Sequence, residues 1–160
     1  MKKLFTLIVL IASCAAISRA DSFTFQMGNA VREGLLTEIH VSKDILPLVS
    51  PEIRKKIPLL GKVDGVTAVT VFTAQNEEAV NRCYQILNSS FTYSEETSLL
   101  LLNAEGKEYT AIYGTKNSQE QDYFDRIIMF TSDGTQGQIL VVYGTITPQV
   151  LAVIKDSASK

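Results

Sequence analysis

Two neighbouring segments near the C-terminus carry apolar side chains on both faces of any strand that they form. One contains the run Ile127-Ile128-Met129-Phe130, and the other runs from Ile139 to Tyr143. A strand with one face in water alternates apolar and polar residues, whereas a strand that is covered on both sides is apolar throughout. The fold must therefore cover both faces of this pair, either within the chain or with a partner.

The remaining segments alternate between strand and helix patterns. Periodicity and turn residues predict strands over 35–41, 63–73, 98–103, 108–114, 126–131 and 138–146. They predict helices over 77–88 and 148–155, with shorter helical turns over 26–33, 43–49 and 51–57. This order indicates a single α+β domain with a mostly antiparallel sheet and helices packed on one face.

Two kinds of cover compete for the second face. The helices over 77–88 and 148–155 can cover one face of the sheet. The lead-in 21–34 and the helical turns over 43–57 can cover the other. The alternative is a protein partner, a second copy of the chain or a lipid-like ligand on that face, because monomers seldom leave large apolar patches in water.

Four polar residues are expected to start helices by capping their first turn. Asn76 precedes two glutamates, while Ser50 and Thr147 each precede a proline, which favours the first helical position. Ser42 is expected to cap the turn over 43–49 in the same way.

The N-terminus has the order of a secretory signal peptide. Residues 1–3 are short and cationic, residues 4–17 are almost entirely apolar, and the small residues Ser18 and Ala20 follow. The apolar stretch is short for a bilayer span, and small residues three and one positions before a cut are typical of signal cleavage. We therefore predict a signal peptide over 1–20.

A second cut is compatible with the same region. Ile11-Ala12-Ser13-Cys14 has the form of a lipobox, an apolar residue and two small residues before a cysteine. Cleavage after residue 13 would leave Cys14 N-terminal, where its thiol can form the thioether to diacylglycerol. Lipid at Cys14 is the only membrane attachment that we expect.

The mature chain is acidic and has no internal disulfide. Removal of residues 1–20 takes away three basic residues and no acidic one, which leaves 12 basic and 17 acidic residues and a net charge of −5. This charge argues against nucleic acid as a partner. Cys83 is the only cysteine after Cys14, so the fold relies on its core.

Three segments resemble one exported family. Glu38 to Leu46 is similar to its strand-then-helix opening, and Tyr93-Ser94-Glu95-Glu96 to its tyrosine–acidic step after the central helix. Ile139 to Thr147 is similar to its closing strand, glycine and helix restart. The family is the uncharacterised domain of unknown function 4252 of Gram-negative envelopes. The resemblance implies a small exported protein, often a lipoprotein, with no assigned activity or functional residues. The short lead-in before Leu35 departs from it.

The chain offers few candidates for catalysis. His40 is the only histidine, so a histidine-cluster metal site is excluded, and Glu38 shares its strand face by the period of two. Cys83 lies on the apolar stripe of the helix over 77–88, which favours packing over nucleophilic chemistry. The acids Glu120, Asp122, Asp125 and Asp133 match no calcium-binding spacing. We expect no metal and no cofactor.

These observations favour a non-enzymatic binding or interaction module of the cell envelope, located in the periplasm, at the outer membrane or secreted. Two alternatives stay open: a secreted hydrolase that uses Glu38 and His40, and a small carrier of an apolar ligand. The hydrolase needs a concave pocket around His40, and the carrier needs a sizeable apolar cavity.

The first prediction concerns processing in the native host. We expect the intact mass of the purified mature protein to correspond to a start at Asp21 or to a diacylated start at Cys14. A full-length chain that begins at Met1 and stays in the cytosol would contradict export.

Overall fold

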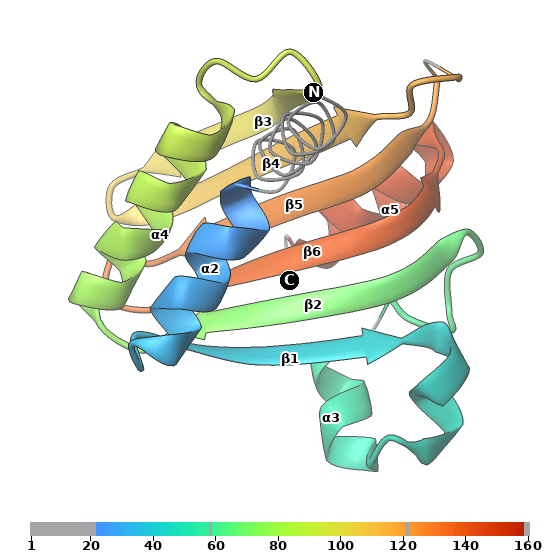
Figure 1. The fold of residues 1–160 in the computed structure, drawn as a ribbon, viewed down its shortest axis with the longest axis horizontal. Helices are drawn as coiled ribbons and strands as arrows, with labels where there is room; N and C mark the ends of the chain where they lie inside the picture. Colours follow the sequence, from blue (N-terminus) through green and yellow to red (C-terminus); the bar gives the residue numbers. More distant parts are fainter. Residues whose placement is uncertain (1–21, 58, 121, 159–160) are drawn as a thin grey trace, which may run out of the picture.

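The sheet of this protein is antiparallel throughout and has its most apolar strands at its centre (Figure 1). The computed structural model describes residues 22–57, 59–120 and 122–158, so the predicted signal peptide and Cys14 lie outside the described residues. Six strands pair in the order β1-β2-β6-β5-β4-β3. They are β1 (Leu36–Ser42), β2 (Val66–Ala74), β3 (Thr97–Glu105), β4 (Glu108–Lys116), β5 (Phe124–Ser132) and β6 (Gly137–Ile146). The predicted α+β class and antiparallel sheet are confirmed.

Helices cover both faces of this sheet. The helical elements are α2 (Ser22–Arg32), η1 (Lys43–Leu48), α3 (Pro51–Lys56), α4 (Glu77–Phe91) and α5 (Pro148–Ala158). Figure 1 shows α2 and α4 in front of the sheet and α5 behind it. The expectation that helices pack on one face was therefore wrong. The assignment of 77–88 with 148–155 to one face, and of the lead-in 21–34 with 43–57 to the other, was also wrong, because α2 lies with α4 and the segment after α3 lies with α5.

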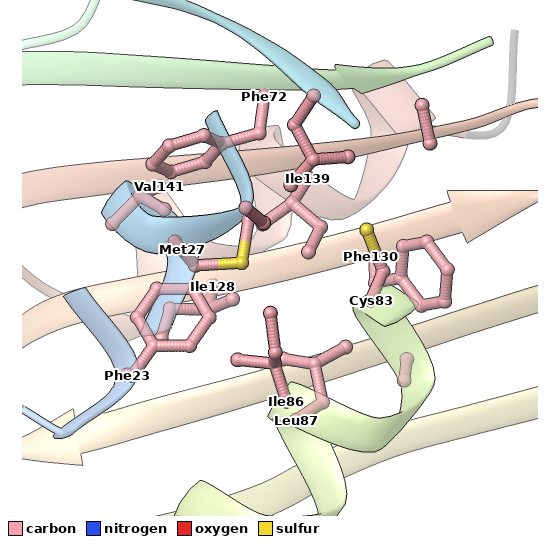
Figure 2. Packing of buried hydrophobic residues seen from close by; sticks show 14 of the residues in the cluster. Phe23, Met27, Phe72, Cys83, Ile86, Leu87, Ile128, Phe130, Ile139 and Val141 are labelled. Atoms are coloured by element: carbon pink, nitrogen blue, oxygen red, sulfur yellow. The ribbon is translucent and has the colours of Figure 1, made fainter. Parts of the chain in front are cut away.

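The layer formed by α2 and α4 covers the face that carries Ile128, Phe130, Ile139 and Val141 (Figure 2). The register places Ile128 opposite Val141 and Phe130 opposite Ile139. Helix α4 buries its apolar stripe, which includes Cys83 and Leu87, against these side chains. Helix α2 is longer than the predicted turn over 26–33, because Phe23, Met27 and Ala30 recur at helical spacing and are all buried.

The second layer covers the face that carries Ile127, Met129, Leu140 and Val142. It is built from α5, whose Ile154 is fully buried, and from the segment around Ile57, Leu59 and Leu60 that follows α3. The side chains of Ile128, Phe130, Leu140 and Val142, two on each face, are at most 9% exposed. Both faces of β5 and β6 are thus covered by elements of the same chain, without a partner, a second copy or a ligand on either face.

Three of the four predicted caps are confirmed. The side chain of Asn76 accepts from the backbone N–H of Ala79 at 2.9 Å, and Ser50 and Thr147 make the equivalent bonds at the starts of α3 and α5. Ser42 was wrongly predicted as a cap, since its side chain makes no capping hydrogen bond. It is the last residue of β1, paired with Ala68.

We expect Gly144→Ala to lower the free energy of unfolding by roughly 2–4 kcal/mol. Gly144 has a φ of 145°, and a Cβ there would overlap the carbonyl oxygen of Gly65. Gly28→Ala is the matched control, because its Cβ would lie 3.8 Å from the guanidinium of Arg32 inside helix α2. The control should be neutral or stabilising by about 0.5–1 kcal/mol. Urea denaturation measures both, and equal stabilities of the two variants would contradict the expectation.

Candidate functional site

Glu38 and His40 lie on the edge strand β1 with exposed side chains. The register pairs Glu38 with Phe72 and His40 with Thr70, so both side chains project from the face that α2 and α4 cover. The Nδ1 atom of His40 lies 2.6 Å from the hydroxyl oxygen of Thr70, which is only 3% exposed. The tautomer of the ring decides which of the two atoms donates.

The hydrogen bond to the neighbouring strand orients the imidazole of His40. The hydrogen bond that the structure gives His40 goes to Thr70 and not to Glu38. Neither His40 nor Glu38 lines any of the three hollows described below. The expected sharing of a strand face is therefore found, and neither residue contributes to these three hollows.

Three hollows are lined by other residues of the part of the chain that the structure describes. The largest, about 740 Å³, is lined by the strand ends and turns around Gln75, Glu108 and Asp133. The second, about 610 Å³, lies along the first turns of α4 beside Glu33, among residues that include Glu78. The third, about 260 Å³, is the most enclosed and contains Arg126. All three are lined mainly by polar side chains, so none of them is the apolar cavity that a carrier of apolar ligands requires.

Two of the four acidic residues considered as calcium ligands, Asp133 and Asp125, have local hydrogen-bond partners. One carboxylate oxygen of Asp133 accepts hydrogen bonds from the backbone of Thr135 and Gln136 and from the Thr135 hydroxyl. These hydrogen bonds lower the pKa of Asp133, and the bond from the backbone of Gln136 has the largest effect. Asp125 accepts from the amide of Asn117 at 2.8 Å. Within the described residues no group of three or more potential ligands is placed to hold a metal ion.

Cys83 is a packing residue, as its position on the helical stripe predicted. Its side chain is 1% exposed and unpaired, and burial raises its pKa to about 12. Figure 2 shows it inside the cluster that α4 forms with the sheet. A thiol held in the neutral form and out of contact with water is a poor nucleophile.

The edge strand β3 has a feature that sequence reasoning missed. Its leucine run was predicted as a strand, but the strand order that places it at an edge was not readable from the sequence. Within the described sheet, β3 pairs with β4 alone. Leu99 is 49% exposed and Leu102 is 54% exposed. The edge therefore presents leucines where an edge strand usually presents charge.

Comparisons with known proteins add no relative: no family model, no curated protein and no solved structure matches the chain. The resemblance to the exported family stays a prediction. A search of the described residues for a helix with the length and apolarity of a membrane span finds none.

We expect the free energy of unfolding to fall as the pH rises from about 9 towards about 12. In this window the Cys83 thiol of the unfolded chain ionises while the buried thiol of the folded chain keeps its proton, so the unfolded state gains stability. Cys83→Ala should flatten this decline in urea denaturation across the window. A residual slope will remain, because burial also raises the pKa of Tyr109 and Tyr113. Identical pH dependence in the wild type and the variant would contradict the assignment.

Proposed function

We propose that this chain is an exported cell-envelope protein that acts without catalysis, as a module that binds an extended segment of a partner protein along the edge of β3. The charge–apolar–small order of residues 1–20 supports export, with the periplasm or the outer membrane as its location. The observation that carries the binding role is the character of the β3 edge. The hydrolase and carrier alternatives have no comparable support.

The two edges of the sheet differ in a way that bears on this proposal. Edge strand β1 exposes Thr37, Glu38 and His40, which are polar or charged and discourage the addition of another strand. Edge strand β3 has the sequence TSLLLLNAE, with no charge before Glu105 and no proline. A continuous apolar run of this kind is typical of a strand that has neighbours on both sides.

Strand addition would give β3 the environment that its sequence suits. The backbone N–H and C=O groups on the open side of an edge strand are a template for a further strand, and alternate side chains supply specificity. Leu102 projects towards the α4 face, since it pairs with Ala111, and Leu101 towards the opposite face, since it pairs with Ile112. An added strand could therefore contact leucine on either face of the sheet.

The regular part of the edge lies after a bulge. The pairing of β3 with β4 shifts register between Leu99 and Leu101, which places Leu100 in a β-bulge. Bulges twist an edge and interrupt pairing. A partner strand is therefore expected to pair with residues 101–105, where the ladder between β3 and β4 is continuous.

Charge selects the partner. Exposed glutamates flank the edge at both ends, Glu95 and Glu96 before β3 and Glu105 and Glu108 at the turn that follows. They outnumber the lysines beside them, which are Lys107 in the turn and Lys116, whose backbone N–H donates to the carbonyl of Glu96. Antiparallel pairing of two copies would bring the first pair of one copy towards the second pair of the other, and like charges repel. An extended apolar segment with lysine or arginine at its ends gains attraction at the same positions. We therefore assign the edge to a basic-ended segment of another protein rather than to a second copy.

The test uses the mature protein and short synthetic peptides of alternating valine and threonine, one with lysines and one with glutamates at its ends. We expect the lysine-ended peptide to bind more tightly in fluorescence anisotropy, and the difference to shrink as salt is added. Leu102→Lys should weaken that binding by at least roughly tenfold, because it places a cation on the edge. Amide exchange should slow in β3 when the peptide is bound.

Leu48→Lys is the matched control. Leu48 is 87% exposed on η1, away from β3, so this variant carries the same chemical change and should bind as the wild type does. Equal binding of the two peptides, or equal binding by the two variants, would overturn the assignment of the edge. A dimer of the mature protein in light scattering that Leu102→Lys converts to a monomer would replace the partner protein with a second copy.

A further inference from the structure

The most enclosed of the three hollows lies where two helices and four strands converge. Its wall includes the first turn of α2, the last turn of α4, the start of β3 and the ends of the central strands. Its volume is about 260 Å³, below the range of roughly 300–1,000 Å³ that is usual for drug-sized ligands. The hollow therefore suits a ligand of only a few heavy atoms.

Arg126 forms the cationic part of this hollow. Its guanidinium carbon lies 5.8 Å from the ring centroid of Phe23 and 6.0 Å from that of Phe91, so an aromatic ring from each of the two helices holds it. Its Nε donates a long hydrogen bond of 3.4 Å to the hydroxyl of Thr115. Its side chain is partly buried, and the interactions that the structure gives it are this hydrogen bond and the two ring contacts. A guanidinium held in this orientation is preorganised to bind a carboxylate through two parallel hydrogen bonds.

The hydroxyl groups beside Arg126 are already arranged. The hydroxyl oxygens of Thr97 and Thr115 lie 2.7 Å apart, and Thr97 is only 4% exposed. The hydroxyl of Ser94 accepts from the backbone N–H of Thr97 at 3.0 Å. These bonds fix the wall of the hollow, so that a ligand would meet a preorganised surface.

Two carboxylates beside Arg126 in the wall of the hollow determine which combination of charges a ligand needs in order to bind. Glu96 and Asp125 are both exposed and line the hollow with Arg126, and the amide of Asn117 holds Asp125 in place. A phosphate would meet one cation and two anions. A molecule that carries both a carboxylate and an ammonium group finds an opposite charge for each.

We propose that this hollow binds a small α-amino acid as its zwitterion, with the carboxylate on Arg126 and the ammonium group towards Glu96 and Asp125. The site adjoins the start of β3 and shares Glu96 with the charges that flank that edge, but it does not depend on the partner assigned to the edge.

The probe is L-alanine, with acetate and ethylammonium as compounds that each carry one of its two charges. Isothermal titration of the mature protein should give L-alanine an affinity at least roughly tenfold higher than that of either single-charge compound. Glu96→Gln should weaken L-alanine binding by roughly two- to fivefold and leave acetate binding no weaker, since Glu96 is an exposed charge. Arg126→Gln should abolish the binding of both L-alanine and acetate.

A check of folding and one further variant, Leu102→Lys, keep the result interpretable. Arg126→Gln also removes the contact with both rings, so its folding is checked by circular dichroism, and Glu96→Gln tests the proposal on a residue whose exposure makes it safe for the fold. Leu102→Lys should bind L-alanine as the wild type does, which separates this site from the edge. Absence of L-alanine binding, acetate binding of equal strength, or a Glu96→Gln variant that binds L-alanine unchanged would each overturn the proposal.

Discussion

The two-sided burial of β5 and β6 is the constraint on which the rest of the structure depends. Ile128 and Phe130 point to one face, and Ile127 and Met129 point to the other. Since apolar side chains on both faces must leave water, one layer of helices cannot be enough. The chain builds the front layer from α2 and α4 and the rear layer from α5 and the segment after α3, which are far apart in sequence. The central position of β5 and β6 follows, because central strands are the ones that both layers can reach.

This placement of cover at the centre leaves the edges to be protected by their own side chains. At β1 that protection is visible, since Glu38 and His40 face water and the ring of His40 is held by Thr70. At β3 the cover is thinner: Leu101 is half-buried while Leu102 is more than half exposed. The same distribution of helices that completes the core therefore makes the two edges unequal.

Local signals allowed most elements to be predicted, and contacts distant in sequence were what escaped. Asn76 and Ser50 act through neighbours three residues away, so their caps were readable. The apolar stripe of α5 shows which side of that helix is buried, but the path of the chain after β6 decides which face of the sheet it covers. The pairing of His40 with Thr70 joins residues that are 30 apart in sequence. The register between two strands so far apart cannot be predicted from the residues of either strand alone. For the candidate site, Glu38 and His40 could be named, whereas the clamp on Arg126 by Phe23 and Phe91 needed three elements to be placed first.

A sheet whose central strands are covered on both faces restricts how such a domain can bind anything without opening its core. Faces covered by α2, α4 and α5 are closed to ligands unless a helix moves, and moving one exposes buried residues such as Met27 or Ile154 at a cost that a binding step would have to repay. Edges and ends carry no such cost, because residues there are already partly in water. The apolar edge at β3 and the hollow that contains Arg126 are both of this kind. Glu96 and Thr97, at the start of β3, line the hollow, whereas the stretch of β3 that a partner strand is expected to pair with, residues 101–105, begins four residues later. A domain of this kind can therefore bind at an edge and at an end without any change in the packing of its core.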